Sequence, residues 1–216
     1  MEIEVLEGIF DANEIIARKN RAMLDECGAF MVNVMASPGA GKTSFIMRTL
    51  SGVSGDLQCA VIEGDIAGKV DSEKIAATGV QAIQINTGGS CHLEAKQINT
   101  ALERLDMEGV ELVIVENVGN LVCPAEFKLG EDLKVMILSV AEGHDKPLKY
   151  PLMFSESDVL IVNKIDLIPH TDFEMDTLED TVLKMNPKIA IFKMSCRTGE
   201  GVSDWTAWLK WRVSGK

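Results

Sequence analysis

The sequence contains none of the features that mark a secreted or membrane-spanning chain. Residues 1–8 carry acidic side chains and no basic segment followed by an apolar core, so we expect no signal peptide. No apolar run approaches the length that a membrane helix needs. The five cysteines are scattered and odd in number, which favours a reducing compartment over a disulfide framework. These absences predict a cytoplasmic protein with no membrane partner.

Basic side chains are too few for a protein that binds nucleic acid. Lys and Arg number 21 against 33 Asp and Glu, which gives a formal net charge of −12, and no basic stripe is visible. Hydrophobic residues make up 46% of the chain, enough for a folded core. From the length of 216 residues we expect one α/β domain over 29–216, preceded by a helical segment over 1–28.

Short apolar runs alternate with helical patterns along the chain. Because most of these runs are apolar throughout, they predict strands of a parallel sheet whose two faces are covered by helices. The fold class expected is therefore α/β, with a doubly wound, mostly parallel sheet and right-handed crossovers. The expected strands are 30–35, 58–63, 80–86, 110–117, 135–141, 159–163 and 189–194, and the expected helices are 8–27, one ending near 50, 92–106, 172–185 and 201–212.

A glycine-rich phosphate-binding loop follows the first apolar run. The segment Ala36-Ser-Pro-Gly-Ala-Gly-Lys-Thr43 fits the strand, loop and helix pattern of a P-loop, with Ala in place of the first glycine. Its glycines let the backbone wrap around an oxyanion at the positive end of the next helix. Lys42 is expected to reach the β- and γ-phosphates, and the Thr43 hydroxyl to hold Mg²⁺. The predicted phosphate-binding residues are Pro38, Gly39, Ala40, Gly41, Lys42, Thr43 and Ser44.

A second motif predicts guanine as the base. The strand 159–163 leads into Asn163-Lys164-Ile-Asp166, where a carboxylate can accept hydrogen bonds from guanine N1–H and N2–H₂. Adenine has no matching donors, so Asp166 selects GTP over ATP, while Asn163 supports the loop and the Lys164 stem packs along the ring. Taken alone, a capping Asn and a solvated Asp would explain the motif equally well. A second base-contacting loop is expected at Ser195, Cys196 and Arg197.

Two carboxylates are placed to bind Mg²⁺ through water. Asp65 and Glu116 each follow an apolar run, and the carboxyl ends of parallel strands meet at the ligand crevice. Mg²⁺ takes few protein ligands, so Thr43 with these two residues suffices. Asp65 is also a candidate to orient the attacking water, and the amide of Gly119 to sense the γ-phosphate. Simple loop polarity is the alternative explanation for Asp65.

A candidate transition-metal site combines Cys91, His92 and Cys123. The first two are expected to open the helix over 92–106, and Cys123 lies four residues after Gly119. Two thiolates and an imidazole suit Zn²⁺ or Ni²⁺. The pattern has no CxxC spacing, so a buried cysteine and a helix-start histidine remain the alternative. Three ligands leave the fourth coordination position open for delivery of the metal, or for a ligand from a twofold-related chain. Because Cys123 lies so close to Gly119, nucleotide state could change metal affinity, and metal would then change nucleotide affinity in return.

Taken together, these motifs resemble those of the hydrogenase nickel-incorporation GTPases (HypB), in the dimerising SIMIBI class of P-loop GTPases. The Cys-His pair combined with Asn-Leu-Val-Cys-Pro is specific to that family, whereas the related urease GTPases (UreG) carry Cys-Pro-His after the switch. The resemblance extends from about residue 8 to residue 212. The segments that carry it are 36–43, 63–65, 89–94, 116–124, 145–151 and 163–166.

The resemblance implies GTP-dependent homodimerisation, with the Cys91, His92 and Cys123 metal site at the dimer interface. It also implies that slow, Mg²⁺-dependent GTP hydrolysis drives nickel transfer to a hydrogenase large-subunit precursor, with a nickel chaperone of the HypA type as partner. Lys146 and Lys149 lie in a loop that, by the same resemblance, contacts nucleotide or the partner subunit; a solvated basic turn is the alternative.

One departure from some family members bears on nickel storage. The first cysteine is Cys27 and the chain has only three histidines, so an N-terminal Cys-rich motif and a His-rich tract are both missing. Bulk nickel storage is therefore disfavoured. Three alternatives remain to be separated by experiment: a urease-type nickel GTPase, a small-molecule phosphotransferase that uses ATP, and a metal buffer with a vestigial nucleotide site.

Overall fold

The computed structural model describes residues 8–65, 75 and 78–215, apart from the side chains of residues 8–11 and Asp65. The strands are β1 (Phe30–Ala36), β2 (Cys59–Asp65), β3 (Gln81–Asn86), β4 (Leu112–Glu116), β5 (Leu133–Ser139), β6 (Val159–Asn163) and β7 (Ala190–Met194). The helices are α1 (Gly8–Cys27), α2 (Lys42–Val53), α4 (Ala95–Leu102), α5 (Cys123–Glu126), α6 (Lys146–Lys149), α7 (Pro151–Ser155), α8 (Met175–Met185) and α9 (Val202–Ser214), with 3-10 turns η1 (Val140–Glu142) and η2 (Ile165–His170). Within these ranges no helix has the length and apolar character of a membrane span.

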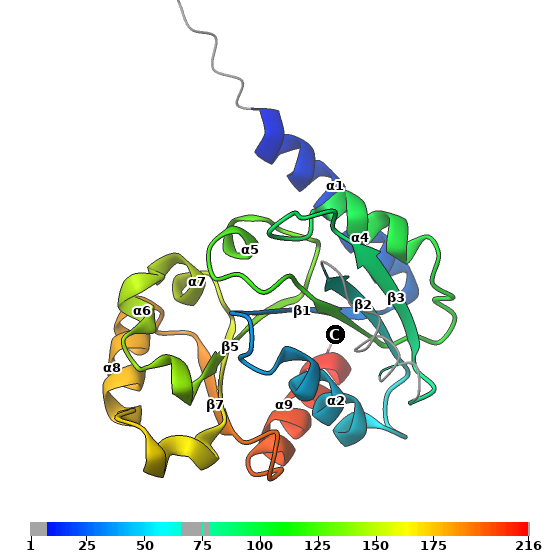
Figure 1. Cartoon of the computed structure of the whole chain (residues 1–216). Coiled ribbons are helices and arrows are strands. Elements are labelled where there is room, and N and C mark those ends of the chain that lie inside the picture. Colours follow the sequence, from blue (N-terminus) through cyan, green and yellow to red (C-terminus); the bar gives the residue numbers. More distant parts are fainter. Residues whose placement is uncertain (1–7, 66–74, 76–77, 216) are drawn as a thin grey trace, which may run out of the picture.

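A single parallel sheet organises the described chain in the order β3-β2-β4-β1-β5-β6-β7. The connection from β4 to β5 crosses from one side of β1 to the other, so the direction of winding reverses at β1. Ligands of open α/β sheets bind at the carboxyl end of such a switch point. The P-loop follows β1 at this position (Figure 1), and the doubly wound parallel fold expected from the sequence is confirmed.

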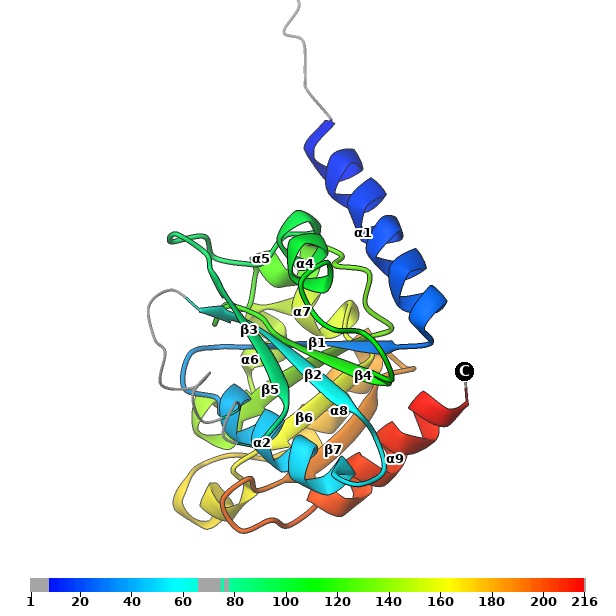
Figure 2. The same ribbon diagram turned by 90° about the vertical axis from the view of Figure 1, so that its right-hand side faces the viewer.

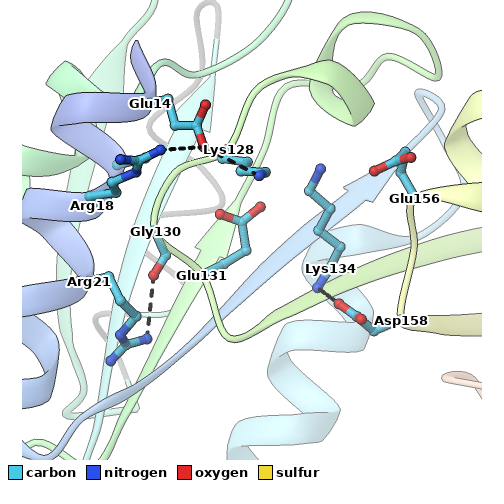
Figure 3. Close-up of a pocket in the computed structure, with 10 residues that line it drawn as sticks. Glu14, Arg18, Arg21, Lys128, Gly130, Glu131, Lys134, Glu156 and Asp158 are labelled. Carbon is cyan, nitrogen blue, oxygen red and sulfur yellow. Dashed lines mark hydrogen bonds and ion pairs between the residues drawn. The ribbon is translucent and has the colours of Figure 1, made fainter. Parts of the chain in front are cut away.

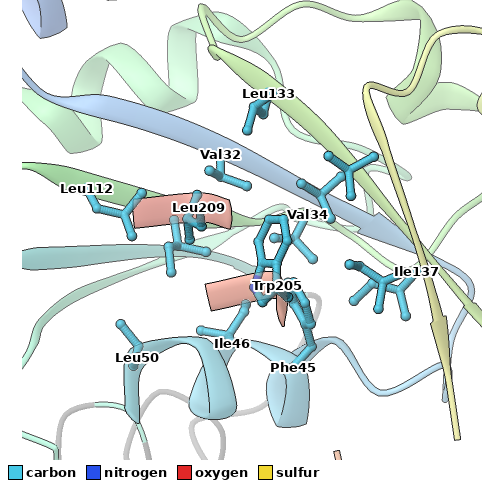
Figure 4. Close-up of a cluster of buried hydrophobic side chains, with 14 of the residues drawn as sticks. Val32, Val34, Phe45, Ile46, Leu50, Leu112, Leu133, Ile137, Trp205 and Leu209 are labelled. Atoms are coloured by element: carbon cyan, nitrogen blue, oxygen red, sulfur yellow. The ribbon is translucent and has the colours of Figure 1, made fainter. Parts of the chain in front are cut away.

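Helices cover both faces of the sheet. The central strand β1 is therefore buried throughout, and its side chains alternate between two cores. Figure 2 shows α2 and α9 on one side of the sheet and α1 and α4 on the other. On the first side, the Phe45 ring of α2 packs at a tilt against Trp205 of α9, whose indole nitrogen donates to Thr49 Oγ1 at 2.9 Å. Figure 4 shows this cluster, with Val32 and Val34 of β1 facing the two helices.

Helix α1 is tied to the two segments that follow the predicted metal ligands, one after Cys91 and His92 and one after Cys123. Asn13 accepts a hydrogen bond from the Ala95 amide at 2.9 Å and donates to the Lys128 carbonyl at 2.8 Å. The buried Asn20 donates to the carbonyls of Ala95 and Leu129 at 2.8 and 2.9 Å. The helical segment over 1–28 is therefore packed into the domain over its described part.

The start of one predicted helix is wrong. The periodicity predicted a helix over 92–106 that Cys91 and His92 would open, but α4 begins at Ala95. Glu94 and Gln97 form a reciprocal capping box, and the Glu94 amide donates to Gln97 Oε1 at 2.8 Å. Cys91 and His92 therefore lie in a turn ahead of the helix, where their backbone is held by other segments.

A second correction concerns the strand expected over 135–141. β5 runs from Leu133 to Ser139, and the chain then turns into η1. Ser139 and Glu142 form a capping box that ends the strand, with the Ser139 amide donating to Glu142 Oε2 at 2.9 Å. Glu142 also contacts the P-loop hydroxyl of Ser37, so the turn supports the phosphate-binding loop.

Candidate nucleotide and metal site

Two adjoining cavities lie at the carboxyl edge of the sheet. The larger, about 500 Å³, contains most of the predicted phosphate-binding residues, and the smaller, about 240 Å³, contains the base-reading residues. Gly41 and Ser44 line both cavities, so the two form the phosphate and base halves of one elongated site. The larger is lined by Gly39, Gly41, Lys42, Thr43, Ser44, Met47, Glu63, Gly64, Glu116, Asn117 and Gly119, and the smaller by Gly41, Ser44, Asn163, Lys164, Asp166, Leu167, Cys196 and Arg197.

The P-loop backbone depends on two glycines and on the base-reading motif. Gly39 and Gly41 have φ values of 77° and 104°, which side chains with a Cβ rarely adopt. Asn163 Nδ2 donates to the Ala40 carbonyl at 3.0 Å, and Lys164 Nζ donates to the Gly39 carbonyl at 2.8 Å. A Cβ on Gly41 would lie 2.6 Å from Asn163 Nδ2. The base-reading motif thus fixes the phosphate loop, which adds a loop contact to the role expected of Lys164.

The loop that follows β7 supports the base cavity from behind. Ser195 Oγ donates to Asp166 Oδ1 at 2.6 Å, and the Cys196 amide donates to Asn163 Oδ1 at 3.2 Å. Ser195 is wholly buried and does not line the cavity, and its side chain orients Asp166. A contact of the backbone amides of this loop with the base stays a prediction. Ala40, within the P-loop, is likewise buried and lines neither cavity. Burial raises the pKa of the Cys196 thiol to about 11, which keeps it protonated near neutral pH.

Arg48 supports the loop of the base cavity without lining that cavity, and the motifs did not reveal it. Its guanidinium donates to the Cys196 carbonyl at 2.7 Å and to the Arg197 carbonyl at 3.1 Å, which joins α2 to the base loop. The two bonds span sequence separations of 148 and 149 residues. The sequence around Arg48 contains no motif that would predict contacts at such a distance along the chain.

We predict that Arg48→Ala weakens nucleotide binding roughly three- to tenfold. Two hydrogen bonds from a charged, exposed group contribute on the order of 1 kcal/mol each, and here they hold the loop that faces the base. Fluorescent GTP-analogue titration measures the change, with Arg18→Ala as control, because exposed Arg18 pairs with Glu14 one helical turn away. Equal affinity in Arg48→Ala and the unmodified chain would contradict the prediction.

The predicted magnesium ligands are only partly placed by the structure. Thr43 Oγ1 donates to Glu116 Oε1 at 3.1 Å, and both residues line the phosphate cavity. A hydroxyl beside a carboxylate is the hard oxygen environment that Mg²⁺ requires, so these residues fit the ion. The side chain of Asp65 lies outside the described part of the structure. Glu63, opposite Glu116 in the β2–β4 register, also lines the cavity and was not predicted.

Cys91, His92 and Cys123 come together beside this cavity. One ligand atom from each lies within 4.8 Å of the others. The Cys91 sulfur is 3.1 Å from the Cys123 sulfur and 3.4 Å from His92 Nδ1. The His92 ring stacks on Phe127 with centroids 4.0 Å apart, which fixes its orientation. Two sulfur donors and one imidazole in contact fit a Zn²⁺ or Ni²⁺ ion.

The electrostatics of the three ligands differ. Burial lowers the pKa of His92 against the influence of Glu94 and Glu126, which favours the neutral imidazole that binds metal. The hydrogen bond with Cys91 raises the pKa of Cys123, and burial adds to this. Buried His92 Nε2 has no hydrogen-bond partner among the residues that the structure describes. The imidazole is thus poised as a ligand, whereas binding a metal at Cys123 must displace a proton.

Lys146 and Lys149 line neither of the two cavities. Lys149 pairs with Asp145 at 2.5 Å. Lys146 lies 3.9 Å from Glu142 and 5.4 Å from the Tyr150 ring centre. A contact of either lysine with a partner subunit therefore stays a prediction.

A third cavity, about 340 Å³, opens at the amino-terminal edge of the sheet, away from the predicted residues (Figure 3). Most of its charged groups are engaged with one another or with backbone. Arg18 pairs with Glu14 at 3.2 Å, and Asp158 accepts from the Lys134 amide at 2.8 Å. Buried Lys134 also donates to the Ala125 carbonyl at 2.7 Å, which holds the segment after Cys123. We assign this cavity a structural role.

Comparison with known proteins agrees with this geometry. The family model described as "CobW/HypB/UreG, nucleotide-binding domain" matches residues 30–193. The hydrogenase maturation factor HypB of Azotobacter vinelandii is 47% identical over 96% of this chain and 69% of its own length. HypB of Helicobacter pylori, solved in complex with nickel, superposes with a TM-score of 0.90 at 35% identity, covering 94% of this chain and 96% of that one. HypB from Archaeoglobus fulgidus gives a TM-score of 0.88 at 34% identity, covering 94% of this chain and 99% of the other. With a sheet wound around a P-loop and relatives at this level of identity, the chain belongs to the HypB family of CobW/HypB/UreG nucleotide-binding proteins.

Proposed function

We propose that this protein is a GTP hydrolase that couples nucleotide-dependent dimerisation to nickel delivery during hydrogenase maturation. The observation that carries the proposal is the cluster of Cys91, His92 and Cys123 on the same sheet edge as the nucleotide cavities. Nickel is the cargo of this reaction, and Zn²⁺ is a second ion that the same donors suit.

The residues divide the work of GTP hydrolysis between binding and charge neutralisation. The P-loop amides and Lys42 neutralise the phosphates, and Asp166 selects guanine. Thr43 and Glu116 would hold Mg²⁺ in the phosphate cavity, with Asp65 as a further ligand through water and as the residue that orients the attacking water. Bound Mg²⁺ supplies charge stabilisation for phosphoryl transfer. Slow turnover is expected from the resemblance to the HypB GTPases.

The metal site is proposed to lie at the interface of a GTP-bound homodimer. Three ligands from one chain leave a closed tetrahedral site incomplete, and a twofold-related chain can supply the remainder. Val122, beside Cys123, is a half-exposed apolar side chain at this position. The hydrogenase large-subunit precursor is the proposed recipient, with a HypA-type chaperone as partner. Two relatives, at 36% and 37% identity, are named hydrogenase/urease maturation factors, so urease is the second candidate client.

The decisive experiment measures oligomeric state and nickel binding with a GTP analogue and Mg²⁺, with GDP, and without nucleotide. Light scattering after gel filtration is expected to give a dimer with the analogue, and phosphate release is expected to require GTP and not ATP. A monomer under saturating analogue would remove the shared-interface model. Preference for ATP would favour a phosphotransferase, and nickel affinity without any nucleotide response or hydrolysis would favour a metal buffer.

A further inference from the structure

The segment after β4 contacts the backbone on both sides of His92. Asn117 Oδ1 accepts a hydrogen bond from the Leu93 amide at 3.1 Å. Asn120 Nδ2 donates to the Cys91 carbonyl at 3.2 Å. The residues immediately before and after His92 are therefore each bound to one asparagine of the same four-residue segment.

Gly119 lies between these asparagines and against the P-loop. A Cβ on Gly119 would lie 3.2 Å from the Pro38 amide nitrogen and 3.3 Å from Lys42 Nζ. Gly119 also lines the phosphate cavity. Since packed elements shift between discrete arrangements, a change at the phosphates that displaces Gly119 must also displace its neighbours.

Asn117 is anchored on its far side by a chain of buried polar groups. The side chain is 1% exposed, and Nδ2 donates to Asn33 Oδ1 at 3.1 Å in the middle of β1. Asn33, itself fully buried, donates to Glu131 Oε1 at 3.3 Å. Asn117 Oδ1 accepts a second bond from the Val118 amide at 2.9 Å. A buried network satisfied in this way holds one geometry, and displacing one member strains the rest.

The Leu93 end of this connection is also firmly packed. Leu93 is fully buried, and a Cβ on Gly64 at the end of β2 would lie 2.7 Å from its side chain. Leu93 thus has little room to move independently of Asn117. A shift of the segment after β4 would therefore reach the backbone of His92.

We propose that Asn117 and Asn120 transmit the nucleotide state to the metal site, by moving the backbone on both sides of His92 when Gly119 moves. This inference rests on the proposed function, because it requires metal at Cys91, His92 and Cys123. The two asparagines act as positioning residues. Their contribution is a coupling between two binding equilibria, and that coupling is the same measured from either ligand.

The test compares nickel dissociation constants of the full chain with a GTP analogue and with GDP. Asn120→Asp is the sharpest variant, because it keeps the acceptor bond from the Val122 amide (2.9 Å) but cannot donate to the Cys91 carbonyl. Asn120 also interacts with the Cys123 thiol, so absolute affinity can change in both states and the ratio is the informative quantity. Asn117→Ala removes the buried connection. Asn86→Ala is the matched control, since the bond of the Asn86 side chain within the described part of the chain is the one it accepts from the Gly88 amide of its own turn, at the same sheet edge.

In the unmodified chain and in Asn86→Ala, the nickel dissociation constants with GTP analogue and with GDP are expected to differ about fivefold or more. In Asn117→Ala and Asn120→Asp the two constants are expected to be nearly equal. By reciprocity, nickel should change the ratio of GTP-analogue affinity to GDP affinity by the same factor. A ratio of one in the unmodified chain, or an unchanged ratio in Asn120→Asp, would overturn the inference; if Asn117→Ala fails to fold, Asn120→Asp decides alone. Nickel that still binds after both Cys91 and Cys123 are replaced would instead refute the proposed metal site.

Discussion

Asp166→Asn is expected to weaken GTP binding roughly 100-fold or more and to create affinity for xanthosine triphosphate. The carboxylate can accept from both N1–H and N2–H₂ of guanine, and a hydrogen bond to a charged group contributes about 1.5–3 kcal/mol. An Asn amide at this position places a donor against the guanine amino group. Xanthine carries a carbonyl there, so the same amide becomes complementary to it. The variant should therefore exchange one base for another and keep the phosphate half of the site.

Competition titrations with GTP, ATP and xanthosine triphosphate measure this exchange. The matched control is Asp172→Asn, an exposed acid just after η2 that lines neither cavity. Folding is checked by thermal unfolding, because Asp166 also accepts the Ser195 hydroxyl. Undiminished GTP affinity in Asp166→Asn would show that another group reads the base.

Replacing both Cys91 and Cys123 with Ser is expected to abolish stoichiometric nickel and zinc binding. The change removes both sulfur donors of the cluster, and a neutral hydroxyl is a poor substitute for a thiolate with these ions. His92 alone would leave at most weak binding. The nucleotide cavities contain neither cysteine, so GTP affinity without metal should be unchanged.

Metal affinity is measured by competition with a chelator of known affinity. The control replaces Cys27 and Cys59, which lie outside the cluster; burial raises the pKa of the Cys59 thiol to about 11 and keeps it protonated. The control protein should bind nickel as the unmodified chain does. If the Cys91 and Cys123 double variant keeps one tightly bound nickel, the metal lies elsewhere.

The fold could be predicted from sequence because its signals are local. The run over 159–162 is apolar throughout and leads directly into Asn163, and such continuous runs occur where both faces of a sheet are covered. The P-loop could be located for the same reason, since its glycines and Lys42 are contiguous. Placing Cys123 near Cys91 needed only the rule that parallel strands end at one edge of the sheet.

Contacts between distant segments could not be predicted in this way. Arg48 meets a loop 148 residues later, and Asn117 meets Asn33 84 residues earlier, through side-chain hydrogen bonds that leave no periodic pattern. Asn33, a polar residue inside an apolar strand, was the one visible sign of a buried network. The start of α4 was misplaced because the Glu94 and Gln97 capping box outweighs the apolar periodicity that continues ahead of it.

The asparagines of α1 have a consequence for protein engineering. A minimal GTPase trimmed to begin at β1 would retain the P-loop and the base-reading motif. It would lose Asn13 and Asn20, which together bind the Ala95 amide and the carbonyls of Ala95, Lys128 and Leu129. Such a truncated protein would lack the hydrogen bonds that hold the segments after the proposed metal ligands. It would keep every residue that lines the two nucleotide cavities. For anyone shortening this protein, a unit that keeps the supports of the proposed metal site therefore includes α1, whereas the residues that line the two nucleotide cavities all lie after it.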